Sequence, residues 1–315
     1  MAIRQHILPR FLLKGFASRT NKNKVYAWVY QKDGRCYEPN IINIAVGRKF
    51  YGEDGEGTAD GKITDFEGQF APLLDQMRYL KHGEEVDRSE AAEFVSHMEI
   101  RTKHIRDSFL KPVKIMANEF GQIISNLEGV NLALSDDPHL KNKFQKLPAY
   151  QKKAILAASK KFFATVEAAT PQMVKQGHVQ SLSKTVAPEW RVQRYCKFFW
   201  YVCHTEQNLI LGDVGIIWEV SDNRKFVSIT FKADTINNIF LPISSNKMLV
   251  GTTLPQAPGV NVTAINLQVA RMSREYFVAS AKSQNMAELV RQIGQKSELL
   301  SEKEARELVR NKLKR

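Results

Sequence analysis

The sequence predicts an α+β fold in which a mixed or antiparallel sheet carries a layer of helices. Apolar residues recur at helical spacing through 64–168, whereas 194–243 holds β-branched and aromatic runs separated by short polar turns. Strands and helices are therefore segregated along the chain, as in α+β proteins. We expect helices at about 64–168 and 263–313, a single domain over 1–285 with 64–168 as a helical insertion, and a charged helical tail over 286–315.

The composition sets limits on the class of protein. The 315 residues include 46 Lys or Arg and 33 Asp or Glu, for a net charge of +13, and 43% are hydrophobic. These values are those of a globular chain and exclude collagen, a disulfide-rich miniprotein and overall disorder. No stretch approaches the ~18 apolar residues that span a bilayer, and three cysteines suit a reducing compartment. We expect a cytoplasmic protein with no membrane partner.

The N-terminal part contains a hairpin and a loop. In residues 24–38, Val25, Ala27 and Val29 alternate with aromatic residues, and a turn containing Gly34 follows. Residues 52–61 hold four glycines and four acidic residues, which predicts a loop.

The next segment predicts a series of helices. The run from Thr64 to Glu67 has the pattern of a capping box, which predicts that a helix begins there. A second helix is expected from Ser89 through Phe109, and a third over 113–127.

Two prolines mark the starts of further helices. The pair Asp137 and Pro138 suits the first turn of a short helix. Pro148 suits the start of a helix over 149–168, and the prolines and glycine within 170–189 predict a connector.

The period then changes to that of strands. Residues 194–204, 209–220, 225–232 and 237–243 read as four strands, and 263–280 returns to helical spacing. On the first of these strands aromatic residues alternate with basic ones. Such a strand could stack on single-stranded bases, although an aromatic core strand is the simpler interpretation.

Charge is unevenly distributed along the chain. Residues 1–50 carry a net charge of +8, 51–138 a net −9, 139–200 a net +10 and 201–315 a net +4. Clustered basic residues release counterions from phosphates, so this asymmetry indicates nucleic acid as the partner, and a solvated basic surface is the alternative. The expected contacts are Lys152, Lys153, Lys160, Lys161, Arg191, Arg194 and Lys197.

Common catalytic signatures are missing from the sequence. It contains no glycine-rich phosphate loop, no dinucleotide-binding fingerprint and no Gly-x-Ser-x-Gly elbow. Cys196 and Cys203 lack a second cysteine pair, which argues against structural zinc. The function must therefore be argued from individual polar residues.

Several motifs in a fixed order resemble a known family. They are His6-x-x-Pro9-x-Phe11-Leu-Leu, then Asp65 to Leu73, then Phe94 to Thr102, then Leu209 to Asp213. Together they resemble a widespread, mainly bacterial family of domains of unknown function, over about residues 3–280. The family usually has proline two residues after the aspartate, where this chain has Gly215. Scattered members look like parts of antiphage or mobile-element gene sets, which implies a nucleic-acid-directed effector but no established activity.

Five polar residues are candidates for a functional site. His6 precedes a buried anchoring segment and could act as a general base, or simply cap that segment. Asp213 follows an apolar strand in a glycine-flanked turn, where it could be presented to a substrate or hydrogen-bond its own backbone. Arg101 lies among apolar neighbours, so it needs an anion, either Glu67 or Asp213 within the protein or a substrate phosphate. His104 lies one turn further along the same face.

These residues support two hypotheses. In the first, His6, Glu67 and Asp213 form the catalytic site of a nuclease, with Glu67 and Asp213 binding Mg²⁺ or Mn²⁺ and with Arg101 and His104 holding the substrate. In the second, the same residues form a structural polar network, and the protein is a non-catalytic module that binds nucleic acid or a nucleotide. The sequence leaves open a protein partner or a homo-oligomer.

Overall fold

The computed structural model describes residues 3–297, with gaps at 222–224 and 231–233, together with 303, 306 and 307. The chain divides into two compact units. The first unit comprises 1–105 and 178–299, and the second comprises 106–177 and 300–315. The expected α+β class is confirmed, because helices cover antiparallel sheets in the first unit.

The larger sheet of the first unit has five strands in the order β10-β9-β11-β12-β7, and every neighbouring pair is antiparallel. Trp200, Trp218 and Leu241 from these strands are fully buried. Burial of such residues supplies most of the driving force for folding. The strands are β7 (Phe199–His204), β9 (Ile217–Val220), β10 (Lys225–Val227), β11 (Ile236–Ser244) and β12 (Lys247–Thr252).

A second antiparallel sheet has the order β5-β4-β13-β8, and two short ribbons complete the β structure. The predicted hairpin within 24–38 is present as β4 and β5, joined by a turn in which Gly34 has a φ of 90°. The strands are β1 (Arg4–His6), β2 (Arg19–Asn21), β3 (Lys24–Tyr26), β4 (Trp28–Gln31), β5 (Cys36–Tyr37), β6 (Val46–Arg48), β8 (Leu211–Gly212) and β13 (Tyr276–Ala279).

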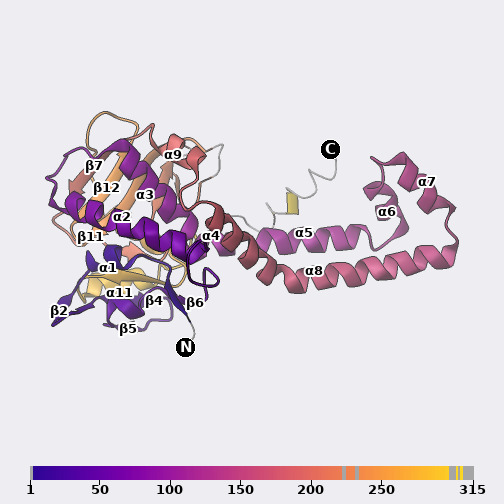
Figure 1. The fold of residues 1–315 in the computed structure, drawn as a ribbon, viewed down its shortest axis with the longest axis horizontal. Helices are drawn as coiled ribbons and strands as arrows, with labels where there is room; N and C mark the ends of the chain where they lie inside the picture. The colour runs from indigo at the N-terminus through magenta and orange to yellow at the C-terminus, as the bar shows by residue number, and fades with distance from the viewer. Residues whose placement is uncertain (1–2, 222–224, 231–233, 298–302, 304–305, 308–315) are drawn as a thin grey trace. The chain divides into compact units, whose positions relative to one another are not determined.

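Helices α2 (Ala59–Tyr79) and α3 (Arg88–Arg101) lie across the larger sheet (Figure 1). The predicted start of a helix at Thr64 is wrong. The side chain of Thr58 accepts a hydrogen bond from the backbone of Gly61, so the helix begins five residues earlier. The prediction for the next helix is close, because Asp87 caps it and the helix begins at Arg88, one residue before Ser89. It ends at Arg101, however, and α4 (Lys103–Ser108) follows after an extended Thr102.

Two other segments of the first unit differ from the predicted secondary structure. Residues 189–195 form helix α9, so the expected strand over 194–204 is wrong in its first part. The expected helix over 263–280 ends at Met272, and β13 follows. The remaining helices are α1 (Arg10–Lys14), η1 (Ile41–Asn43), α9 (Glu189–Tyr195), α10 (Val262–Met272) and α11 (Gln284–Val290). Of the tail expected over 286–315, residues 298–302, 304–305 and 308–315 lie outside the described residues.

The second unit is built mainly from helices. Asp137 caps α7 and Pro138 is its first residue, as expected. The connector expected over 170–189 is wrong, because helix α8 continues to Lys184 through Pro171. The helices in or entering this unit are α5 (Leu110–Ile123), α6 (Leu127–Ala133), α7 (Pro138–Lys146) and α8 (Ala149–Lys184). In the described part of the chain, no helix is both long and apolar enough to cross a membrane.

Candidate functional site

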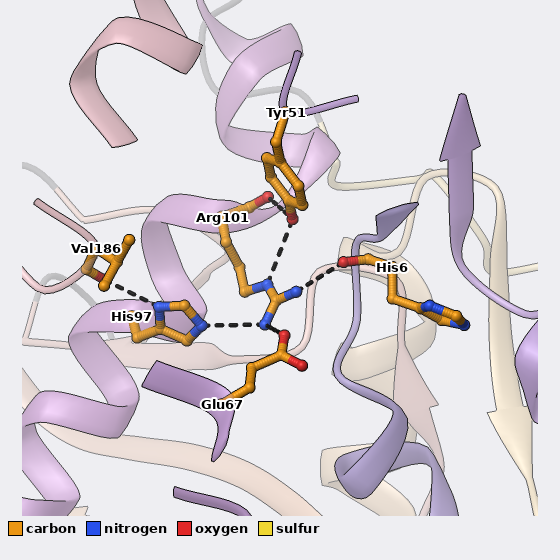
Figure 2. Close-up of polar contacts among 6 residues, drawn as sticks. All are labelled: His6, Tyr51, Glu67, His97, Arg101 and Val186. Carbon is orange, nitrogen blue, oxygen red and sulfur yellow. Dashed lines mark hydrogen bonds and ion pairs between the residues drawn. The ribbon is translucent and has the colours of Figure 1, made fainter. Parts of the chain in front are cut away.

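Arg101 is the centre of a buried polar cluster in the first unit. Its side chain is fully buried, and four of its five N–H donors have protein acceptors. Nη1 forms an ion pair with Glu67 and contacts Nε2 of His97 at 3.0 Å, while Nη2 donates to the backbone carbonyl of His6 at 2.7 Å (Figure 2). Nε lies 3.4 Å from the hydroxyl of Tyr51, which donates to the carbonyl of Arg101. Of the partners expected for Arg101, the structure selects Glu67.

The protonation state of His97 follows from its two neighbours. Arg101 can only donate, so Nε2 of His97 must accept, and Nδ1 then donates to the carbonyl of Val186 at 3.0 Å. This requires a neutral imidazole, and burial together with the Arg101 cation holds the pKa of His97 well below its usual range. In the sequence, the only signal for His97 is its position four residues before Arg101, one helical turn away.

His6 contributes its backbone, and not its imidazole, to this cluster. In Figure 2 the ring points away from the guanidinium of Arg101 while the carbonyl points towards it. Burial, with the nearby Arg10 and Arg101 cations, lowers the pKa of His6 to about 4. Nε2 is buried and has no hydrogen-bond partner among the described residues. The hydrogen bond from Arg101 to the carbonyl of His6 holds β1 next to α3.

Glu67 lies inside α2 and not at its first turn, so the capping-box explanation of this residue is wrong. From the middle of the helix its carboxylate reaches Arg101 on α3. A buried guanidinium without a partner is strongly destabilising, so this pair holds the two helices together.

Asp213 lies apart from the Arg101 cluster in the contacts of the described residues. It follows β8, and its carboxylate accepts backbone hydrogen bonds from Arg274 at 2.9 Å, Glu275 at 2.7 Å and Tyr276 at 3.3 Å. Burial raises the pKa of Asp213 to about 6, against the opposite effect of these donors. Gly215 has a φ of 75°, which proline cannot adopt, so a proline would not fit this turn.

A cavity of about 330 Å³ lies beside Asp213. His104, Lys103 and Arg274 also line it. Nε2 of His104 lies 2.7 Å from the hydroxyl of Ser228, and burial with the nearby Arg274 cation lowers the pKa of His104 to about 3. The predicted residues Asp213 and His104 therefore share one cavity, whereas His6 and Glu67 meet at Arg101.

Glu99 anchors a second buried cluster, which is not predicted from the sequence. It forms an ion pair with Arg191 and accepts hydrogen bonds from Tyr195 at 2.6 Å and from the hydroxyl of Thr230 at 3.0 Å. Arg194 donates to the carbonyl of Asp234 at 2.6 Å. Two of the predicted nucleic-acid contacts, Arg191 and Arg194, are thus engaged inside the protein, because 189–195 is a helix that packs on α3.

The predicted lysines differ in their surroundings. Lys153, Lys160 and Lys161 are exposed on α8, and none has a carboxylate partner among the described residues. Lys152 is half-buried and donates to the carbonyl of Gln145 at 2.7 Å. Lys197, in the first unit, is exposed after α9.

The carboxylates expected to bind a metal do not fit one ion. Glu67 accepts from Arg101, and Asp213 accepts from three backbone N–H groups in a separate place. Metal ligands need oxygens that converge on one point. Within the described ranges, no group of three His, Cys, Asp or Glu side chains is placed to hold a metal ion.

Comparison with known proteins identifies a family and no relative of known activity. Neither the curated proteins nor the solved structures include a significant match to this chain. The family described as "Protein of unknown function (DUF4238)" matches residues 4–288, which covers β1, both polar clusters, the helices of the second unit and β13. The chain is therefore a member of this family of unknown function.

Proposed function

We propose that this protein is a nucleic-acid-binding module that uses the exposed lysines of α8, and that the His6, Glu67, Arg101 and Asp213 set is structural. The observation that supports the proposal is that Arg101 has partners within the protein and the exposed lysines of α8 lack carboxylate partners among the described residues. The N–H donors of Arg101 are engaged within the protein, whereas Lys153, Lys160 and Lys161 are exposed without a carboxylate partner in the described part of the chain.

The chemistry of exposed lysines supports a phosphate backbone as the ligand. An ammonium group on a flexible stem forms ion pairs with phosphates without fixing a base sequence. The 139–200 segment has a net charge of +10, so few acidic side chains compete for the same lysines. We infer binding that is weakly sequence-dependent and strongly salt-dependent.

The test is a binding titration of labelled single-stranded DNA, duplex DNA and RNA at several salt concentrations. The variant replaces Lys153, Lys160 and Lys161 with Gln, and a control of equal charge change replaces the exposed Lys22, Lys24 and Lys81. We expect the α8 variant to bind more weakly, with a slope of log K against log salt on duplex DNA shallower by about 2 to 3. The proposal fails if wild-type protein binds none of the three probes, or if both variants lose affinity equally.

A metal-dependent nuclease remains a second candidate because Asp213 shares a cavity with His104, Lys103 and Arg274. Cleavage of plasmid, single-stranded DNA and RNA would be followed with Mg²⁺, Mn²⁺ or EDTA. Cutting that needs the metal and disappears in a folded Asp213→Asn variant would support this candidate. A place in a bacterial defence or mobile-element system is likewise proposed only from the family resemblance.

A further inference from the structure

The second unit contains a hairpin of two antiparallel helices, α5 and α8, whose apolar side chains are not all covered. Asn118 on α5 donates to Glu167 on α8 at 3.3 Å. Close to this pair, Gly121 packs against Phe163 so tightly that an added Cβ would lie 3.1 Å from the Cβ of Phe163. The two helices therefore touch along this line, in opposite directions.

One side of α8 carries an exposed apolar stripe. Ile155, Phe162 and Met173 are 7 and 11 residues apart, which is about two and three helical turns, so they share one face. Phe162 is 60% exposed and Met173 is 52% exposed. Large apolar side chains that line up and remain in solvent mark an interaction surface.

The corresponding side of α5 is also apolar. Phe109 and Met116 are exposed and seven residues apart, and Phe120 lies one turn further along. The bonded pair Asn118 and Glu167 lies roughly 120–180° around each helix from these apolar residues. Since this bond joins the polar flanks, the two apolar stripes lie together on the other side of the hairpin.

Two of the exposed lysines of α8 are on the opposite side from the apolar face. On α8, Lys153 and Lys160 lie about 150° around the helix from Ile155. Two copies could pack their apolar faces together without bringing these lysines into contact. An anionic membrane would meet the apolar face without the lysines, so this charge arrangement favours a protein surface.

The size of the face is compatible with a dimer. From Ile155 to Met173 it extends about 27 Å, at a rise of about 1.5 Å per residue, and two helices are about 20 Å wide. That is roughly 540 Å² on each copy, or about 1,100 Å² in total, near the lower limit for a specific interface.

We propose that the apolar face of the α5–α8 hairpin, formed by Phe109, Met116, Phe120, Ile155, Phe162 and Met173, is the interface through which a second copy of this chain packs. The product is a four-helix arrangement with a two-fold axis, in which both lysine faces point outward. The dimer does not depend on the proposed nucleic-acid function. If both proposals hold, each dimer has two symmetric basic surfaces for nucleic acid.

The test measures molar mass by sedimentation at about 10 µM in three full-length proteins. Phe162→Glu places a charge in the proposed interface. Ala164→Glu is the matched control, because this exposed residue lies about 200° around the same helix. We expect twice the 35.9 kDa chain mass for the wild type and the control, and at least tenfold weaker dimerisation for Phe162→Glu.

Three outcomes would overturn the proposal. A monomeric wild type at this concentration would do so, and so would a dimer that Phe162→Glu leaves intact, which would place the interface elsewhere. The third is a monomer that sediments with phosphatidylserine-containing vesicles and loses this association in Phe162→Glu, which would assign the face to a membrane. Circular dichroism spectra of all three proteins would confirm that the variants are folded.

Discussion

Arg101 in the first unit and the lysines of α8 in the second unit carry the same charge in opposite surroundings. Arg101 is fully buried and joined to Glu67, to His97 and to the backbone of His6. Lys153 and Lys160 are exposed without a carboxylate partner among the described residues. A buried cation stabilises the fold only while its partners are present, whereas an exposed cation contributes little to stability and is accessible to a ligand. The charge pattern of a sequence therefore gives no direct map of its binding surface.

The largest expected effect is on the buried side of this comparison. Arg101→Leu should lower the free energy of unfolding by about 3–5 kcal/mol, because Glu67 loses its cation and the carbonyl of His6 loses its donor. Denaturant titration would measure the change, with the exposed Arg48→Leu as the control.

The double variant Arg101→Leu with Glu67→Leu sharpens this prediction. It should be more stable than the sum of the two single effects predicts, because no charge is left unpaired. If Arg101→Leu lowers the free energy of unfolding no more than Arg48→Leu does, the cluster is not structural. Arg101 would then again be a candidate for binding a ligand.

The next effect is a loss of stability at acid pH. The folded pKa values of His6, His97 and His104 lie below the unfolded value near 6.5, so the unfolded chain binds three more protons between about pH 6 and 5. Asp213 acts in the opposite sense, because its raised pKa makes the folded state bind one proton more. The net difference of two protons predicts that stability falls by about 2.7 kcal/mol per pH unit as the pH is lowered across this range.

Unfolding titrations at about pH 7, 6 and 5 would measure this slope. His104→Phe removes one of the three histidines, and with it one of the protons bound on unfolding. The slope should therefore decrease by about 1.4 kcal/mol per pH unit. Stability that increases towards pH 5 would contradict the assignment of these histidines as neutral.

The smallest expected effect is on the exposed side of the comparison. Replacing Lys153 or Lys160 with Gln should change the free energy of unfolding by less than about 0.5 kcal/mol, since neither has a carboxylate partner within the described ranges. The same denaturant titration would detect a larger loss, which would show that these lysines support the helix and would weaken the proposed binding surface.

The sequence was sufficient to predict the α+β class and several helix starts, because these depend on local signals. Asp87 and Asp137 accept backbone hydrogen bonds at the starts of their helices, and a cap of this kind is readable from a few residues. The continuation of α8 through Pro171 could not be predicted, because proline normally indicates the end of a helix. The length of such a helix depends on its full sequence and on its packing.

The candidate site was predicted only in part, because its contacts join distant segments. The pairing of Glu67 with Arg101 was among the expected alternatives, and the structure confirms it. The separation of Asp213 from this pair depends on the packing of β8 against β13, which spacing along the sequence cannot give. Arg191 illustrates the same limit, since only the helix at 189–195 turns it towards Glu99.

The bond from Arg101 to the carbonyl of His6 has a consequence for the register of β1. Successive carbonyls in a strand point in opposite directions, so a slip of one residue against β6 would turn this carbonyl away from the guanidinium. A misregistered strand would then leave a fully buried cation short of an acceptor. Arg101 therefore favours the native register of the N-terminal strand. This effect depends on the backbone carbonyl at position 6 and not on the side chain there.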